Sequence, residues 1–267
     1  MGIETEHTLL KILALGDVVG RRALDYLSRR LWRMRDTLGV DLVIANGENT
    51  SEIHGLSAAD ADALLSTGVD VITLGNHAFS ARDIGPFLDD HTDAIIRPAN
   101  YPPACPGAGY TVRRVGGLRM LVMNLSGTVY MDPLNDPFAT ADRILEREAG
   151  EFDLAILDMH AEATSEKLAM GYHLDGRVSV VFGTHTHVPT ADARILPHGT
   201  GYVTDLGMTG PTDGILGTAT AAVLYRMRTH MPTRFTVAEG PIEAQSVVFT
   251  VEDTAPFRCV RVERISF

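Results

Sequence analysis

The chain has 267 residues, of which 45% are hydrophobic and 21% are charged. These values are ordinary for a globular protein with a large core, and no apolar run approaches the roughly 20 residues of a membrane-spanning helix. The formal net charge of −11 argues against a large nucleic-acid interface, whereas a small phosphorylated substrate stays compatible, because a bound metal can supply positive charge locally.

The N-terminal residues, the cysteines and the absence of repeats indicate the location and domain organisation of the protein. Residues 1–8 lack the basic start of a signal peptide, so we expect a flexible lead-in and a cytoplasmic protein. Cys105 and Cys259 form no C-x-x-C motif, which favours reduced, unpaired thiols. No repeat or linker divides the sequence, so residues 1–267 are expected to form a single domain.

The first third of the chain alternates apolar runs with helical patterns. Residues 9–15, 41–45 and 69–74 are predicted strands, and helices are predicted after the first two of them. This alternation favours a largely parallel sheet, whose ligands bind beyond the carboxyl ends of the strands. That rule places five polar side chains on one rim: Asp17, Glu48, Asn49, Asn76 and His77.

Further strand ends carry histidines. A hairpin over residues 111–124 and a helix over 139–148 precede a predicted strand at 152–159, which delivers His160. The strand at 178–182 leads into a His-x-His pair, and alternate side chains of an extended segment share one side. His185 and His187 are therefore expected to reach one site together. Short β-like runs at 202–204, 246–251 and 259–265 suggest a second sheet.

These strand-end residues have the chemistry of a metal centre. Imidazole nitrogens mixed with carboxylate and amide oxygens suit Fe, Mn or Zn. The ligands are too many for one four-coordinate ion but suffice for two ions that share a carboxylate, as in two-metal hydrolysis.

The order of the motifs resembles the calcineurin-like metallophosphoesterase superfamily. The motifs are Gly16-Asp17, Gly47-Glu48-Asn49, Gly75-Asn76-His77, His160 and Gly183-Thr184-His185-Thr186-His187. Two departures narrow the resemblance: Val19 stands where the superfamily usually has a histidine, and Glu48 replaces its usual bridging aspartate. This pattern looks like the YmdB-like branch, whose members are described as cyclic-nucleotide phosphodiesterases, and residues 160–167 and 183–192 are also similar to it.

The resemblance implies a fold and a cofactor. The fold is a two-sheet α/β sandwich flanked by helices, with two transition-metal ions at one rim, Fe or Mn being favoured and Zn compatible. One ion would be held by Asp17, Asn49 and His187, the other by Asn76, His160 and His185, and Glu48 would bridge both. Asn49 would fill the coordination position that Val19 leaves open.

It also implies a reaction. A metal-bridging hydroxide would attack phosphorus in line, and His77 would donate a proton to the leaving oxygen. Small cyclic nucleotides, above all 2′,3′-cyclic ones, are the expected substrates. Because members of the branch often oligomerise, a homo-oligomer is a further expectation.

Two other functions remain open from the sequence. A phosphatase for monoesters or phosphoproteins would differ in the loops that shape the substrate pocket, expected around residues 101–109 and 129–138. A regulatory protein could use the site to sense nucleotide or RNA with low turnover, although the complete ligand set and His77 argue against it. His54 is expected to line the cleft, and Lys167 is expected on a solvated helix face rather than on a substrate phosphate.

Overall fold

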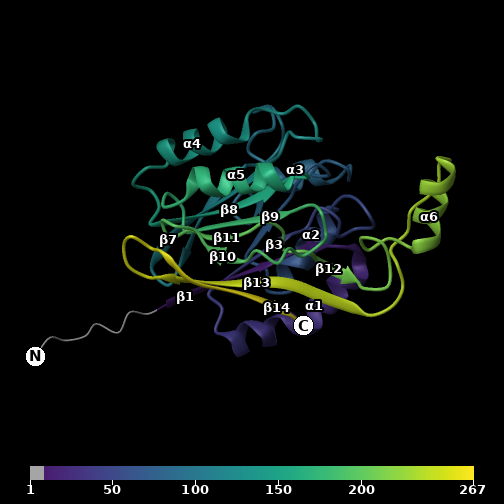
Figure 1. Cartoon of the computed structure of the whole chain (residues 1–267), viewed down its shortest axis with the longest axis horizontal. Coiled ribbons are helices and arrows are strands. Elements are labelled where there is room, and N and C mark those ends of the chain that lie inside the picture. The colour runs from purple at the N-terminus through teal and green to yellow at the C-terminus, as the bar shows by residue number, and fades with distance from the viewer. Residues whose placement is uncertain (1–8) are drawn as a thin grey trace, which may run out of the picture.

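Two β-sheets pack face to face at the centre of the molecule, and helices cover the outer face of each sheet (Figure 1). The computed structural model describes residues 9–267, so the expectation for residues 1–8 lies outside the described part of the chain. Within residues 9–267, no helix has the length and apolar character needed to cross a membrane. The predicted two-sheet α/β sandwich is confirmed.

The first sheet has eight strands in the order β2-β12-β13-β1-β3-β4-β5, with β14 paired to β13. Its parallel part is β1 (Leu9–Leu15), β3 (Leu42–Asn46), β4 (Val71–Thr73) and β5 (Ile95–Ile96). The remaining members are β2 (Asp17–Val18), β12 (Met208–Pro211), β13 (Ile242–Glu252) and β14 (Cys259–Ser266). The predicted run of parallel strands therefore forms one half of a mixed sheet.

The second sheet has six strands in the order β10-β11-β9-β8-β7-β6. The predicted hairpin is β6 (Tyr110–Val115) and β7 (Leu118–Ser126). Parallel to β7 run β8 (Leu154–His160), β9 (Val180–Thr184) and β11 (Gly201–Val203), and β10 (Arg194–Ile195) closes the edge.

The expectation that the late β-like runs build the second sheet is wrong for two of the three. β11 does belong to it, but β13 and β14 return to the first sheet, where β13 pairs antiparallel with β1 from Leu9↔Glu252 to Leu15↔Ser246. Alternation along a strand reveals its two faces but not its neighbours, because pairing is decided by the packing of distant segments.

The helices complete a four-layer arrangement. The first sheet is covered by α1 (Gly20–Leu38), α2 (Ala58–Ser66) and α3 (Ile84–Asp90), and the second by α4 (Pro137–Arg147) and α5 (Thr164–Leu174). β1 shows why: Leu13 and Leu15 pack with α1, whereas Ile12 and Ala14 face the other sheet, as a period of two requires. Ser57 caps α2 as expected, its hydroxyl accepting a hydrogen bond from the Asp60 amide.

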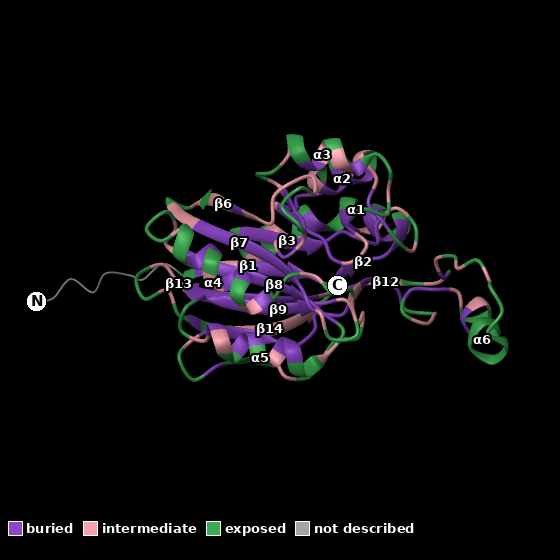
Figure 2. Ribbon diagram, turned by 90° about the horizontal axis from the view of Figure 1, so that it is seen from above, coloured by how far each residue is buried: buried purple, intermediate pink, exposed green. Residues whose placement is uncertain are grey.

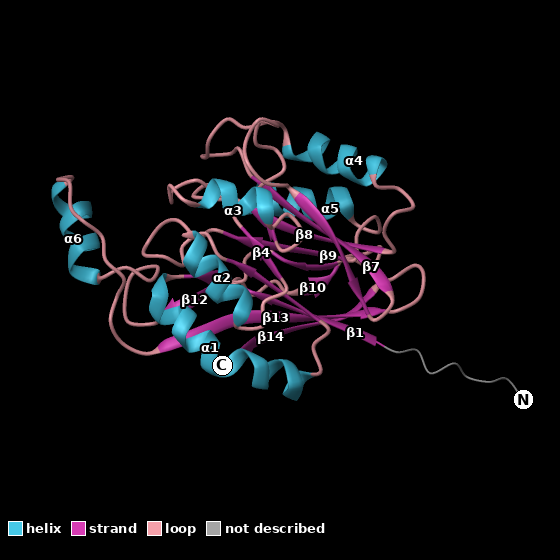
Figure 3. Ribbon diagram, turned by 180° about the vertical axis from the view of Figure 1, so that it is seen from behind, coloured by secondary structure: helices cyan, strands magenta, loops and turns pink. Residues whose placement is uncertain are grey.

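One helix, α6 (Thr220–Thr229), projects away from the sandwich (Figure 3). Its surface is largely exposed, in contrast to the buried strands (Figure 2). Neither α3 nor α6 is predicted from the sequence. α6 buries only Val223, so it has no apolar stripe from which a helix could be inferred.

The two cysteines are free, as predicted. Burial raises the pKa of the Cys259 thiol to about 12, whereas Cys105 is only partly buried. Because the thiolate is the reactive form, we expect a thiol reagent to modify Cys105 in the native protein and Cys259 only after unfolding. Mass spectrometry of the labelled peptides checks this, and rapid native labelling of Cys259 would contradict it.

Candidate metal centre

All eight predicted side chains lie at one rim, beside the carboxyl ends of strands from both sheets. Asp17 lies in β2, just after β1, whereas Glu48 and Asn49 follow β3, and Asn76 and His77 follow β4. His160 is the last residue of β8, and His185 and His187 follow β9. A cavity of about 310 Å³ opens among them, lined in part by Glu48, Asn49, His77, His185 and His187. The rule for parallel sheets thus locates the site in both halves of the sandwich.

One group of side chains converges on Nε2 of His160. This nitrogen lies 3.0 Å from Oε1 of Glu48, 2.9 Å from Oδ1 of Asn76 and 3.1 Å from Nδ1 of His185. Ligand atoms of Glu48, His160 and His185 all lie within 4.8 Å of one another. A set of two imidazoles, one carboxylate and one amide oxygen suits a transition metal.

A second group forms around His187. Its Nε2 lies 3.2 Å from the Asn49 side-chain amide and 3.7 Å from Oδ1 of Asp17. Oδ1 of Asp17 and Oδ1 of Asn49 are buried and have no hydrogen-bond partner among residues 9–267. Buried oxygens without a partner are costly, and a bound cation would satisfy both, so this group also fits a metal ion.

The electrostatics of the first group favour a positive charge. Burial alone would lower the pKa of His160, but Glu48, followed by Asp17 and Asp158, outweighs burial and raises it to about 9. Burial would raise the pKa of Glu48, but His160 and His77 lower it to about 2. A proton on Nε2 of His160 therefore stands where a metal cation would lie.

The far side of the His160 ring is held by groups that sequence reasoning missed. Nδ1 lies 2.9 Å from the Thr184 hydroxyl, which donates to Oδ1 of Asp158 at 2.8 Å. Because that hydroxyl proton is used, Thr184 accepts from Nδ1–H, which leaves Nε2, on the side of Glu48, Asn76 and His185, as the nitrogen that can exchange its proton for a cation. Asp158 is fully buried within β8, where it follows four apolar residues and only His160 is also polar.

Gly75 makes room for His160. A Cβ atom at position 75 would overlap the His160 imidazole ring. The glycine before Asn76 and His77 is therefore required by the close approach of β8 to the turn after β4.

His77 lies beside the two groups and is not part of either. Its backbone N–H donates to Oε2 of Glu48 at 2.8 Å, and its ring stacks on His54 with 4.0 Å between centroids. Burial lowers the pKa of His77. Both rings line the cavity, which confirms the expected position of His54.

The His-x-His pair reaches the cavity by a different route from the one expected. β9 ends at Thr184, and both histidines have left-handed backbone conformations, with φ of 102° at His185 and 62° at His187. They share a site because the chain turns here, not because it is extended. Nδ1 of His187 lies 3.1 Å from the Leu216 carbonyl, a contact that turns Nε2 toward Asp17.

The walls of the cavity also differ from expectation. Residues 101–109 and 129–138 contribute no lining residue, whereas Ile53, Leu216 and Phe235 do. The expectation for Lys167 is wrong: its side chain is 1% exposed and forms an ion pair with Asp205 at 2.7 Å. Lys167 and Asp205 are far apart in the sequence, so no local sequence pattern predicts that they pair.

Comparisons with known proteins agree with this geometry. A family described as YmdB-like protein matches residues 13–265. The chain is 43% identical over 256 residues to the 2′,3′-cyclic-nucleotide 2′-phosphodiesterase of Bacillus subtilis (strain 168), covering 96% of each chain. A hypothetical protein from Thermus thermophilus superposes with a TM-score of 0.90 and 40% identity, covering 97% of this chain and 99% of that one. A Mycoplasma pneumoniae structure described as a novel phosphatase gives a TM-score of 0.90 and 32% identity, covering 98% and 94%. The chain therefore belongs to the YmdB-like family, and the predictions of this family and of a phosphoesterase enzyme are confirmed.

Proposed function

We propose that the protein is a dinuclear metal-dependent phosphodiesterase that hydrolyses small cyclic nucleotides, with 2′,3′-cyclic nucleotides as the favoured substrates. The observation that carries the proposal is the clustering of seven ligand-type side chains at one rim, four of which line the cavity, with two buried oxygens that have no hydrogen-bond partner among residues 9–267.

The proposed ligand roles follow the two groups. Asp17, Asn49 and His187 would hold one ion, and Asn76, His160 and His185 would hold the other, with Glu48 shared between them. Ions bound there would polarise the phosphoryl oxygens and lower the pKa of water enough to supply a nucleophile at neutral pH. Fe or Mn is favoured by the mixed nitrogen and oxygen ligands.

His77 is the proposed proton donor. Its ring reaches the cavity from the turn after β4, and its backbone is fixed by the hydrogen bond to Glu48. From this position the imidazole can pass a proton to the leaving oxygen of an ester bound between the two ligand groups. The stacked His54 ring limits the rotation of His77, which keeps the donor directed toward the cavity.

Size and lining support a small substrate. The cavity volume of about 310 Å³ lies at the lower end of the range for small-molecule sites, roughly 300–1,000 Å³. Ile53, Leu216 and Phe235 offer apolar contacts for a nucleobase next to the polar ligands. The Bacillus subtilis relative is a 2′,3′-cyclic-nucleotide 2′-phosphodiesterase, which makes 2′,3′-cyclic nucleotides the first substrates to test.

A phosphomonoesterase is the second candidate. It is favoured by the Mycoplasma pneumoniae structure described as a phosphatase, which shares the fold over nearly the whole chain. The same ligands could act on a monoester, since the metal centre recognises the phosphoryl group in either case.

A substrate panel tests the proposal. Purified protein is assayed on 2′,3′-cyclic AMP, p-nitrophenyl phosphate and a phosphopeptide, each with and without prior treatment with EDTA. We expect turnover of 2′,3′-cyclic AMP that EDTA abolishes and Mn²⁺ or Fe²⁺ restores. Metal-dependent turnover of the monoesters alone would favour the second candidate, and no turnover with tight nucleotide or RNA binding would favour a sensor.

We also propose that residues 9–267 form one metallophosphoesterase domain, because the chain crosses between the two sheets more than once. Free thiols at Cys105 and Cys259 are in keeping with a reducing compartment such as the cytoplasm.

A further inference from the structure

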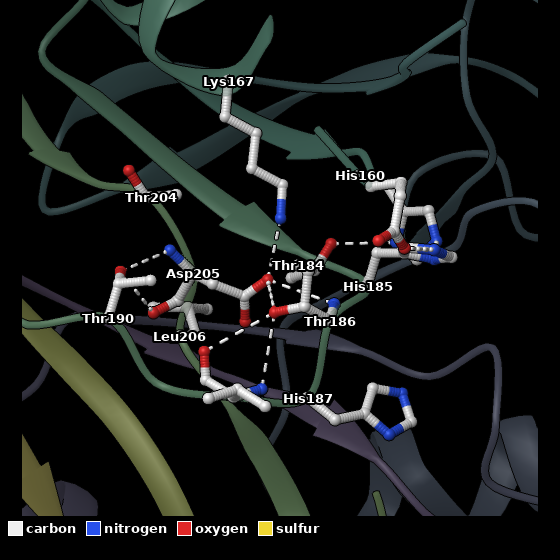
Figure 4. A network of polar contacts seen from close by, with 12 residues as sticks. His160, Lys167, Thr184, His185, Thr186, His187, Thr190, Thr204, Asp205 and Leu206 are labelled. Atoms are coloured by element: carbon white, nitrogen blue, oxygen red, sulfur yellow. Dashed lines mark hydrogen bonds and ion pairs between the residues drawn. The ribbon is translucent and has the colours of Figure 1, made fainter. Parts of the chain in front are cut away.

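A fully buried ion pair lies behind the histidine loop and takes no part in the roles proposed above. Nζ of Lys167 lies 2.7 Å from Oδ2 of Asp205, and the side chains are 1% and 0% exposed. Lys167 comes from the first turn of α5, and Asp205 follows β11, so the pair joins two elements that are distant in sequence. Figure 4 shows Lys167 reaching down to Asp205.

Asp205 holds the middle residue of the His-x-His pair. Its Oδ2 accepts hydrogen bonds from the Thr186 amide at 3.1 Å and the Thr186 hydroxyl at 2.8 Å, in addition to the one from Lys167 (Figure 4). Its Oδ1 accepts from the Gly207 amide at 2.9 Å. Both oxygens of the Asp205 carboxylate therefore accept hydrogen bonds, and two of these four bonds hold Thr186.

The flanking histidines need such support. His185 and His187 both have positive φ, 102° and 62°, a region that residues with a side chain occupy only where the surroundings enforce it. The His185 amide is held by Oδ2 of Asp17 at 3.1 Å, and the ring of His187 by the Leu216 carbonyl. Thr186, bound twice to Asp205, is the fixed point between the two turns.

The sequence makes space for this pair. A Cβ atom at Gly183 would overlap the Thr204 carbonyl and lie 2.8 Å from Cδ of Lys167. The glycine that opens the motif therefore lets the Lys167 side chain pass over β9 to Asp205. Without Lys167, the buried charge of Asp205 would lack its counter-ion, which is strongly unfavourable.

We propose that Lys167 and Asp205 are positioning residues, which hold Thr186 so that His185 and His187 present their nitrogens to the two metal-ligand groups. This inference rests on the proposed metal centre. Lys167 balances the carboxylate, the carboxylate fixes Thr186, and Thr186 sets the left-handed turns on either side of it. Neither charge reaches the cavity, whereas Thr186 lines it.

Lys167→Met tests the proposal, because it keeps the apolar stem and removes the charge. Its control is Arg119→Met, which breaks the Arg119–Asp153 ion pair (2.9 Å). That pair lies at the start of β7 and β8, whereas the candidate metal centre lies at the ends of the strands. Two quantities are measured below the unfolding temperature: Mn²⁺ affinity by calorimetry, and amide hydrogen exchange of the peptide over residues 183–190 in metal-free protein.

We expect Lys167→Met to weaken Mn²⁺ binding by about 10–100-fold, the usual effect of removing a group that orients metal ligands. Exchange over residues 183–190 should become faster, whereas Arg119→Met should change neither quantity. Unchanged affinity and exchange in folded Lys167→Met would overturn the inference, as would equal effects of both variants.

A milder variant keeps the proposal testable if Lys167→Met misfolds. Thr186→Val removes only the hydroxyl that donates to Asp205 and leaves the ion pair in place. It should also weaken Mn²⁺ binding, and an unchanged affinity would contradict the proposal. If the wild-type protein bound no Mn²⁺, the proposed function would fail, while the metal-free exchange comparison would still decide whether the pair holds the loop.

Discussion

His77→Ala is expected to lower kcat for 2′,3′-cyclic AMP by about 10²–10⁴-fold, the usual contribution of a positioned proton donor. Metal content should stay at the wild-type value, because the His77 ring belongs to neither ligand group and its backbone N–H, which contacts Glu48, survives the substitution. Steady-state kinetics and elemental analysis of the same preparation measure both quantities.

Two further variants serve as comparisons for His77→Ala. Asn76→Ala removes a side chain whose Oδ1 lies 2.9 Å from Nε2 of His160, so it should lose metal as well as activity. His198→Ala removes an exposed histidine that lines a different cavity, beside Phe152 and Asp153 at the start of β8, and should change neither. If His77→Ala lost metal together with activity, His77 would be a ligand, and a separate proton donor would have to be sought.

Gly75→Ala is expected to damage the centre although it adds only one methyl group. The new Cβ would overlap the His160 ring, which is packed between Thr184 and Glu48 and has no free space to retreat. Overpacking of this kind costs about 1–3 kcal/mol of unfolding free energy. The displaced ring should also release the ion that His160 is proposed to hold.

Gly85→Ala is the matched control, since its nearest atom, Cγ of Pro106, would lie 3.5 Å from the added Cβ. Gly85 is in α3, where alanine is the better helix former. We expect Gly75→Ala to lower both Tm and metal content and Gly85→Ala to leave both intact or to raise Tm. Normal metal binding by Gly75→Ala would show that the rim can adjust.

The location of the site was predictable because it follows from a simple rule. Parallel strands bring their carboxyl ends together, so Asp17, Glu48 and Asn76 had to meet once their strands were recognised. His160 ends β8 and His185 follows β9, both strands of the second sheet. Their meeting with Glu48 depends on how the two sheets pack, which the motif order implied only through the family resemblance. Fold class and family are confirmed; the ligand roles remain proposals.

The supporting groups were not predictable in the same way. Asp158 sits among apolar residues of β8, and its partners Thr73 and Thr184 come from two other strands. Lys167 occupies a first-turn position that usually faces solvent, and only the gap at Gly183 and the distant Asp205 bury it. These contacts join residues from different elements and sheets, so the hydrophobic periodicity of a single segment does not predict them.

The central claim is that the strand ends of both sheets hold two metal ions. The most direct measurement is anomalous diffraction from crystals grown with Mn²⁺. We predict two anomalous peaks per chain, one among Asp17, Asn49 and His187 and one among Asn76, His160 and His185, with Glu48 in contact with both. A single peak, or peaks away from these side chains, would contradict the dinuclear centre.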